Sequence, residues 1–183
     1  QDASSALAVE AAGICPGNTV MDLCAAPGGK TILAAEFAGE AGHVMSRDIS
    51  EYKTDLIREN LERMNRRNVE VQVYDATVHD PEKEKYADVV LMDVPCSGLG
   101  VMGKKRDIKY HATPESLQSI TELQRQIVAA GWQYVKPHGV LLYSTCTIHR
   151  GENQEMAVWI TENFPFVLEE ERQLLPGTDE TDG

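Results

Sequence analysis

Residues 19–31 read TVMDLCAAPGGKT and combine an apolar run, a proline–glycine turn and the first residues of an expected helix. The apolar run at residues 19–23 predicts a buried strand, and a helix is expected over residues 30–38. Glycine allows the tight turn between them, which presents backbone N–H groups at the carboxyl end of the strand. A strand, a glycine turn and a helix in this order are typical of an open α/β sheet with a ligand site at its strand ends.

Strand and helix patterns alternate along the rest of the chain. This alternation predicts a Rossmann-like α/β fold with a doubly wound, mostly parallel sheet. Proline and glycine at residues 137–139 predict a turn into the fifth strand. Strands are expected over residues 19–23, 43–47, 69–74, 87–92 and 138–144, with a sixth starting within 164–168, and helices over residues 2–12, 30–38, 51–67, 114–135 and 151–162.

The composition is ordinary for one globular domain. The 183 residues are enough to bury a core, and the chain is 42% hydrophobic and 25% charged. The four cysteines lie far apart, and no signal peptide or long apolar span is visible, so a cytoplasmic, reducing location is expected. The five histidines show no spacing against the cysteines that indicates zinc, and no metal site is predicted.

The net charge of −12 is unfavourable for binding nucleic acid, but the charges are unevenly distributed. Acidic side chains gather near the carboxyl end, at Glu169, Glu170, Glu171, Asp179, Glu180 and Asp182. A basic run follows Cys96, with Lys104, Lys105, Arg106 and Lys109. Taken alone such a run indicates a solvated loop, but directly after a reactive cysteine it also fits a loop that contacts phosphate groups.

Two cysteines follow apolar runs that are expected to be central parallel strands. Cys96 ends the motif DVPC (93–96), and Cys146 ends the motif STC (144–146). Because the carboxyl ends of parallel strands meet at one edge of a sheet, both thiols and Asp93 are expected to face one cleft. Thiols placed just beyond strand ends are positioned as reactive groups rather than as core residues.

The glycine turn admits two kinds of ligand. Residues 24–31 approach the phosphate-binding loop Gly-x-x-x-x-Gly-Lys-[Ser/Thr], because Gly29, Lys30 and Thr31 fit the pattern. Cys24 stands where that loop has its first glycine, which supplies the turn that wraps the phosphates. The missing glycine counts against a nucleotide hydrolase, and a nucleoside cofactor is the competing interpretation.

Two aspartates favour the nucleoside cofactor. Asp48 ends the second predicted strand twenty residues beyond Gly28, where a carboxylate can bind ribose hydroxyl groups. Asp75 follows the third predicted strand and is placed to meet an adenine amino group. Each aspartate alone also fits a helix cap or a turn. Together they suit S-adenosylmethionine, whose sulfonium group favours anions and which carries no phosphate.

In order and spacing, the motifs resemble those of the RNA cytosine-C5 methyltransferases. The resemblance is to the bacterial Sun/RsmB-type group in particular, which methylates small-subunit ribosomal RNA, with the NOL1/NOP2/Sun proteins as relatives. It extends to about residue 176. The motifs are DLCAAPGGKT (22–31), DIS (48–50), DAT (75–77), DVPCSGLG (93–100), DIK (107–109), STCTI (144–148) and GEN (151–153), the last in the place of a Glu-Glu-Asn.

This resemblance implies methyl transfer from S-adenosylmethionine to C5 of a cytosine in RNA, with 16S rRNA as the expected substrate. The reaction would pass through a covalent cysteine–C6 adduct. Cys146 would be the nucleophile, Cys96 would resolve the adduct, and Asp93 would hydrogen-bond the base. The expected cofactor-binding residues are Cys24, Ala25, Ala26, Pro27, Gly28, Gly29, Lys30, Asp48, Lys53, Asp75 and Asp93.

The resemblance also sets expectations about domains and partners. Residues 1–183 would form the catalytic domain, without the family's amino-terminal RNA-binding region and its last carboxyl-terminal strand. The expected partner is RNA, no membrane partner is expected, and a monomer is favoured. Two alternatives stay open, a P-loop-type nucleotide hydrolase and a non-catalytic scaffold with a methyltransferase fold.

Overall fold

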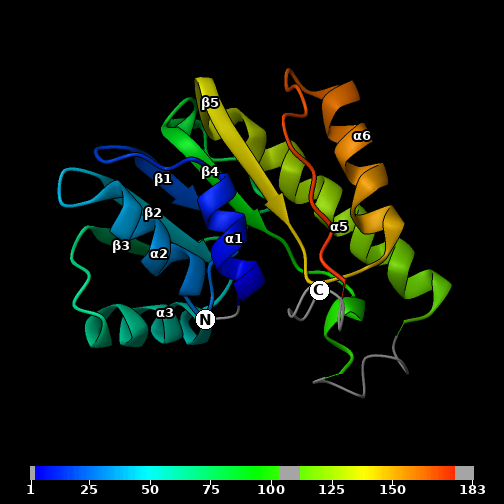
Figure 1. Ribbon diagram of the computed structural model, residues 1–183, viewed down its shortest axis with the longest axis horizontal. Coiled ribbons are helices and arrows are strands. Elements are labelled where there is room, and N and C mark those ends of the chain that lie inside the picture. The colour runs from blue at the N-terminus through cyan, green and yellow to red at the C-terminus, as the bar shows by residue number, and fades with distance from the viewer. Residues whose placement is uncertain (1–2, 104–111, 176–183) are drawn as a thin grey trace.

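The structure, a computed structural model, describes residues 3–103 and 112–175 and has a five-stranded sheet between helices (Figure 1). The strands follow the order β3-β2-β1-β4-β5, and every pairing is parallel. The predicted α/β class with a doubly wound parallel sheet is therefore confirmed. The strands are β1 (Thr19–Asp22), β2 (His43–Asp48), β3 (Val69–Val73), β4 (Ala87–Asp93) and β5 (Val135–Ser144).

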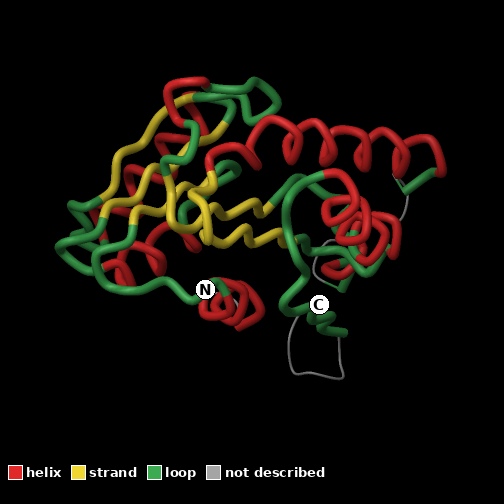
Figure 2. The backbone as a smooth tube through the Cα atoms, turned by 90° about the horizontal axis from the view of Figure 1, so that it is seen from above, coloured by secondary structure: helices red, strands yellow, loops and turns green. Residues whose placement is uncertain are grey.

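Helices cover both faces of the sheet (Figure 2). The α-helices are α1 (Ala3–Ala11), α2 (Gly29–Ala38), α3 (Glu51–Arg63), α5 (Pro114–Gly131) and α6 (Gln154–Asn163). Short 3₁₀ helices are η1 (Pro81–Lys83), η2 (Leu99–Val101), η3 (Trp132–Tyr134) and η4 (Arg150–Glu152). The side with α1, α2 and α3 is opposite to the side with α5 and α6. Within the described part of the chain, no helix has the length and apolar character needed to cross a membrane.

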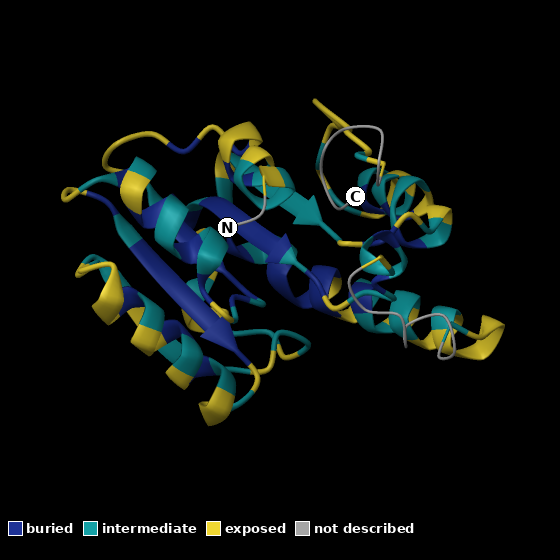
Figure 3. Cartoon of the chain, turned by 60° about the horizontal axis from the view of Figure 1, so that its bottom comes forward, coloured by how far each residue is buried: buried dark blue, intermediate teal, exposed yellow. Residues whose placement is uncertain are grey.

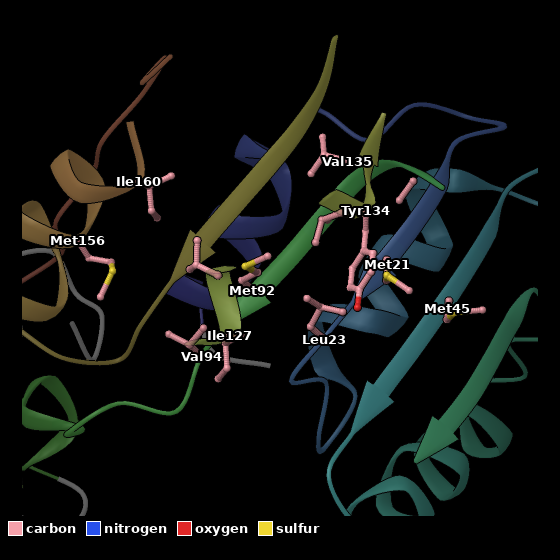
Figure 4. Close-up of a cluster of buried hydrophobic side chains, with 13 residues drawn as sticks. Met21, Leu23, Met45, Met92, Val94, Ile127, Tyr134, Val135, Met156 and Ile160 are labelled. Carbon is pink, nitrogen blue, oxygen red and sulfur yellow. The ribbon is translucent and has the colours of Figure 1, made fainter. Parts of the chain in front are cut away.

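Side chains of β4 alternate between two hydrophobic cores. Val89 and Leu91 pack with α1 and α2, whereas Val90 and Met92 pack with α5 and α6. Figure 4 shows Met92 in the second core, with Ile127 of α5 and Met156 and Ile160 of α6. Because helices cover both faces, β4 is apolar along most of its length, and its sequence shows a continuous run instead of an alternation. Figure 3 shows buried central strands, with the exposed residues mostly on the outer sides of the helices and on loops.

The strand order reverses between β1 and β4. The chain continues from β1 to β2 and β3 on one side of the sheet, and from β4 to β5 on the other. Such a switch point opens a crevice beyond the carboxyl ends of the strands. Asp22, Asp48, Asp93 and Ser144 end β1, β2, β4 and β5, so they lie at the same edge of the sheet.

The predicted sixth strand at residues 164–168 is wrong. This segment is irregular, and the N–H of Phe166 donates to the carbonyl of Phe164 over 2.8 Å, which removes that donor from any ladder. The Phe164 ring packs instead against the rings of Trp132 and Trp159, at centroid distances of 5.4 and 5.3 Å. Aromatic packing, not strand pairing, therefore explains Phe164, whereas Val167 and Leu168 of the same segment are exposed.

The predicted turn at residues 137–139 is wrong as well, because these residues form a bulge inside β5. Ala87 of β4 pairs with Val135, whereas Val89 pairs with Val140. The longer stretch of β5 between these pairs bulges out while the strand stays in the sheet. Proline and glycine serve such a bulge as well as they serve a turn.

We expect Gly139→Ala to destabilise the protein through this bulge. A Cβ atom on Gly139 would lie 2.7 Å from the carbonyl oxygen of Asp88 and 2.9 Å from Cγ1 of Val135. The backbone of β4 cannot yield without disturbing its pairing with β5, so the free energy of unfolding should fall by about 1–3 kcal/mol. Chemical denaturation measures the change. Gly103→Ala is the control, because nothing lies within 4 Å of its added Cβ, and an equal loss in both variants would contradict the explanation.

Candidate active site

The thiols of Cys96 and Cys146 are in contact although fifty residues separate them in the sequence. Their Sγ atoms lie 3.1 Å apart, and the N–H of Cys146 donates to Sγ of Cys96 over 3.2 Å. The two cysteines follow β4 and β5, whose register pairs Asp93 with Ser144. Parallel pairing of these strands thus brings the two cysteine loops together.

The two thiols differ in how readily they lose a proton. The hydrogen bond from Cys96 lowers the pKa of Cys146 to about 7, although burial opposes this change. The pKa of Cys96 is raised, first by its hydrogen bond to Cys146 and then by burial. When one of the two thiols ionises, the favoured arrangement is therefore a Cys146 thiolate that accepts a hydrogen bond from the protonated Cys96. Since the thiolate is the nucleophilic form, Cys146 is the better nucleophile of the two.

An ion pair lies beside the thiols. Nζ of Lys30 is 2.7 Å from Oδ2 of Asp93, and the hydroxyl of Ser144 donates to Oδ1 of Asp93 over 2.8 Å. Lys30 also donates to Oγ of Ser5 on α1, over 3.2 Å. Lys30 belongs to α2 and Asp93 ends β4, so the ion pair joins the two sides of the switch point. The Asp93 side chain is still 36% exposed and can accept further bonds.

A cavity of about 1050 Å³ includes this ion pair in its lining and extends along β5. Lys30, Asp93 and Cys146 line it, together with parts of α1 and of residues 165–174. Asp48 and Asp75 do not line it. The thiol site and the predicted cofactor carboxylates therefore border different parts of the crevice.

The glycine turn after β1 is fixed from two sides. Gly28 has a φ of 102°, in the left-handed region that favours glycine, and its N–H donates to the carbonyl of Ala25. A Cβ at Gly28 would lie 3.3 Å from Cγ2 of Ile57 on α3. The N–H of Ala25 donates to the carbonyl of Arg47 on β2. These contacts hold the amino-terminal end of α2 at the crevice.

Asp48 is buried, and its carboxylate braces this turn. Oδ2 accepts from the N–H of Ala26 over 2.9 Å, and Oδ1 accepts from the N–H of Ile49 over 2.8 Å. Nζ of Lys53 lies 3.0 Å from Oδ1, so Lys53 is paired with Asp48. Oδ2 has two lone pairs and accepts one hydrogen bond, from Ala26, so one acceptor position is left for a ligand hydroxyl group.

Asp75 and Cys24 have local partners that explain them without a ligand. Asp75 is exposed and accepts from the hydroxyl and the N–H of Thr77, over 2.7 and 2.9 Å, and these bonds lower its pKa. Cys24 packs against the hydrophobic core, and burial raises the pKa of its thiol. Their cofactor-binding roles stay predictions, as do the roles of the other predicted site residues.

Asp22, the first residue of the DLCAAPGGKT motif, ends β1, and the sequence patterns assigned no role to it. It is fully buried, and Oδ2 accepts from the hydroxyl of Thr31 over 2.7 Å, while Oδ1 has no hydrogen-bond partner. Burial raises the pKa of Asp22 to about 7, although the Thr31 bond opposes the shift. A buried carboxylate oxygen without a partner suits a cationic group of a ligand. Its position between a strand and a glycine turn was the signal that could have identified it.

A second unassigned group surrounds the thiol loops. It includes the GEN motif at residues 151–153, which the sequence marks only as a family signature. The carboxamide of Asn153 accepts from the hydroxyl of Thr145 over 2.6 Å and donates to the carbonyl of Thr147 over 2.8 Å. Asn153 therefore holds the turn that carries Cys146. No cluster of three or more His, Cys, Asp or Glu side chains that could hold a metal ion occurs among the described residues.

The chain matches a known family over most of its length. Residues 13–163 match the family described as 16S rRNA methyltransferase RsmB/F. Ribosomal RNA small subunit methyltransferase F of Escherichia fergusonii is 36% identical over 184 residues, which cover 98% of this chain and 38% of that protein. The chain thus spans little more than a third of the length of the curated relatives it matches.

Two solved structures are similar along most of the chain. The protein PH0851 gives a TM-score of 0.88 at 32% identity, covering 97% of this chain and 41% of that one. NSun6 from Pyrococcus horikoshii, solved with SFG, gives a TM-score of 0.78 at 27% identity, covering 88% of this chain and 41% of that one.

We expect Asp22→Asn to stabilise the protein at pH 8. The folded state binds the Asp22 proton more tightly than the unfolded state, whose carboxyl has its ordinary pKa of 3.8. Stability linked to this group therefore falls as pH rises from about 4 to about 7. Asparagine does not ionise, so the variant avoids this loss. At about 1.4 kcal/mol per pKa unit the gain is on the order of a few kcal/mol.

Thermal denaturation at pH 4.5 and pH 8 measures this effect. The melting temperature of Asp22→Asn should exceed that of the wild-type protein at pH 8, and the difference should shrink toward pH 4.5. Asp55→Asn is the control, because Asp55 is 61% exposed on α3. A difference that does not change with pH would show that the Asp22 charge is not its cause.

Proposed function

The chain belongs to the RsmB/F family of 16S rRNA methyltransferases, and we propose that it methylates C5 of a cytosine in RNA, with small-subunit rRNA as the substrate. The observation that carries this proposal is the contact between the Cys96 and Cys146 thiols beside the Lys30–Asp93 pair. A reaction through a covalent adduct needs one group to form the adduct and another to resolve it. Two thiols in contact at the ends of adjacent strands supply both.

The residues around the glycine turn fit S-adenosylmethionine as the methyl donor. The buried Oδ1 of Asp22 can accept from an ammonium group, and the remaining acceptor position on Asp48 can receive a ribose hydroxyl. The similar structure of NSun6 contains SFG, an analogue of S-adenosylmethionine. When bound, S-adenosylmethionine supplies an electrophilic methyl group.

Cys146 starts the proposed reaction. C5 of cytosine is a poor nucleophile, so Sγ of Cys146 bonds to C6, and the electron pair of the C5–C6 double bond makes C5 enamine-like. Because its pKa is lowered to about 7, Cys146 forms a thiolate at neutral pH more readily than a cysteine with its ordinary pKa of 9. Cys96 supports this state by donating a hydrogen bond to the Cys146 sulfur, while it keeps its own proton.

Asp93 and Lys30 hold the base in the proposed complex. We assign to Asp93 hydrogen bonds with the cytosine amino group and N3. Because a carboxylate only accepts hydrogen bonds, N3 must carry a proton. This proton neutralises the negative charge that develops on N3 when the thiolate attacks C6. Lys30 and Ser144 orient the Asp93 carboxylate through their bonds to its two oxygens.

We assign Cys96 to the release of the adduct. After methylation C5 carries both a methyl group and a hydrogen. Loss of this hydrogen as a proton restores the C5–C6 double bond and breaks the C6–Sγ bond, whose electron pair returns to Cys146. While Sγ of Cys146 is bonded to carbon, the hydrogen bond to a Cys146 thiolate that raises the pKa of Cys96 is lost. Cys96 can then give its own proton to water and, as a thiolate, take the proton from C5.

The RNA must present an unpaired cytosine. A base inside a helix does not expose C6 to a thiolate, so the target must be unstacked or flipped out. Lys104, Lys105, Arg106 and Lys109 are proposed to contact the RNA backbone, but they lie outside the described residues. The chain's net charge of −12 makes such a local basic segment important for steering RNA.

Binding measurements separate this proposal from a P-loop hydrolase. The Cys24 side chain packs on the core where that loop needs glycine, and Lys30 is already paired with Asp93. We therefore expect isothermal titration calorimetry to detect S-adenosylhomocysteine but not ATP with Mg²⁺. Gly28→Ala should weaken the binding at least about tenfold, because the added Cβ strains the left-handed turn and presses on Ile57. Binding of ATP alone would overturn the assignment.

RNA containing 5-fluorocytosine tests the chemistry, because fluorine at C5 cannot leave as a proton and the adduct is trapped. With S-adenosylmethionine present, we expect a covalent adduct at Cys146 by mass spectrometry. Cys146→Ser should abolish it, whereas Cys96→Ser should still form it and should also accumulate an adduct on ordinary cytosine. Cys15→Ser, at an exposed cysteine, is the control.

The other possible results of the 5-fluorocytosine experiment lead to different conclusions. An adduct on Cys96 would reverse the roles of the two thiols. Failure to form any adduct, with S-adenosylhomocysteine still bound, would support the non-catalytic scaffold.

A further inference from the structure

Glu152 is a fully buried carboxylate that the proposed reaction does not use. It ends η4, beyond the turn that carries Cys146. Oε2 accepts from the N–H of Ser97 and from Nε2 of Gln124, each over 2.9 Å, and Oε1 accepts from the hydroxyl of Ser97 over 2.5 Å. A buried charge is unfavourable unless donors compensate it, so these three bonds explain how a carboxylate is tolerated here.

The partners of Glu152 lie next to the two thiols. Ser97 directly follows Cys96, and its hydroxyl also lies 2.7 Å from the hydroxyl of Thr147. Thr147 directly follows Cys146. Through Ser97, one carboxylate is thus connected to the loops that carry both cysteines.

Gln124 adds a second connection to the Cys96 loop. Its Nε2 donates to the carbonyl of Pro95, the residue before Cys96, as well as to Glu152. Gln124 lies on α5 and is fully buried. The residues on both sides of Cys96 are therefore connected to Glu152. Ser97 bonds to it directly, and the carbonyl of Pro95 shares with it the donor Nε2 of Gln124.

The hydroxyl groups of Thr147 and Ser97 and the carboxylate of Glu152 form a chain of hydrogen bonds with a fixed direction, from Thr147 to Glu152. A carboxylate only accepts, so the Ser97 hydroxyl must donate to Glu152, which leaves the Thr147 hydroxyl to donate to Ser97. The N–H of His149 donates to Oγ1 of Thr147 over 3.1 Å, which is consistent with this order. The direction of the chain therefore depends on an acceptor at Glu152.

We propose that Glu152 is a positioning residue that holds the Cys96 and Cys146 thiols in contact. The proposal deepens the proposed function, because it concerns the thiol pair to which that reaction is assigned. The strand register and two backbone bonds, from Val94 to Ser144 and from Gly100 to Cys146, bring the loops near each other. The Glu152 network then fixes the residues on either side of Cys96, so that its S–H points at the sulfur of Cys146.

Among the other ionisable groups near the thiols, Tyr143 contacts Glu152 only through the backbone, because its hydroxyl donates to the main-chain carbonyl of Glu152 over 2.9 Å. Substitution of the Glu152 side chain leaves that carbonyl in place. Cys146 is faced by Cys96, Asp93 and Lys30, and the last two are held by each other. On the far side of the network, Nδ1 of His149 lies 3.5 Å from Oε1 of Glu152. A change in the titration of Cys146 after substitution of Glu152 would therefore report the contact between the thiols.

Glu152→Gln tests this proposal. Glutamine has nearly the same size but carries N–H donors, so at least one bond of the network must reverse or break. We expect the pKa of Cys146, followed by iodoacetamide alkylation against pH, to rise from about 7 toward its ordinary value of 9. Alkylation at pH 7 should slow at least about tenfold, because only the thiolate reacts. Mass spectrometry resolves Cys146 from the exposed Cys15, which serves as the internal reference.

A matched control is Glu155→Gln. Glu155 lies on α6, close in sequence to Glu152, but its side chain is 66% exposed, so its substitution should leave the Cys146 profile unchanged. This assay needs neither RNA nor cofactor, and its result is therefore independent of whether the chain methylates RNA. Circular dichroism establishes that each variant is folded.

A folded Glu152→Gln variant with an unchanged Cys146 profile would overturn the proposal. If that variant does not fold, Ser97→Ala decides the question, because it removes only the hydroxyl that joins Glu152 to Thr147. Ser97→Ala should raise the pKa of Cys146 in the same direction, and an unchanged profile in this folded variant would equally reject a positioning role.

Discussion

The parallel register of β4 and β5 is the constraint on which the site depends. It pairs Asp93 with Ser144 at the last step of the ladder. The bond from the N–H of Val94 to the carbonyl of Ser144 continues this alignment, and the bond from Gly100 to Cys146 closes one loop onto the other. A slip of one residue would turn every side chain of the strand to the opposite face. The contact between the thiols therefore requires this register.

Electrostatics at the thiols then follows from their contact. Asp93 raises the pKa of Cys146 and Lys30 lowers it, but the hydrogen bond from Cys96 is the largest influence. A chain with a net charge of −12 can hold a thiolate here because Asp93, the carboxylate that acts on Cys146, is paired with the ammonium group of Lys30. The state of Cys146 is thus controlled by one short-range bond rather than by the total charge.

The sequence predicts the parts of this protein that depend on local patterns. Continuous apolar runs and glycine turns are sufficient for the parallel sheet and for the shared edge that carries both thiols. They cannot reveal Glu152, because its burial depends on donors from Ser97 and Gln124, which are distant in the sequence. They also cannot separate a turn from a bulge at residues 137–139, or a strand from an aromatic-packed segment at residues 164–168, because both structures use the same residue types.

The two sides of the crevice are held by different interactions, and Lys30 takes part in both. On the side of β1 and β2, a backbone turn and the buried carboxylates of Asp22 and Asp48 form the region that we propose to bind the methyl donor. On the side of β4 and β5, side-chain hydrogen bonds hold the thiols. The backbone of Lys30 belongs to the first region and its ammonium group to the second, where it binds Asp93. In the proposed reaction, α2 therefore contributes to both regions, through the turn at its amino-terminal end and through the ammonium group of Lys30, which orients the base-binding carboxylate of Asp93.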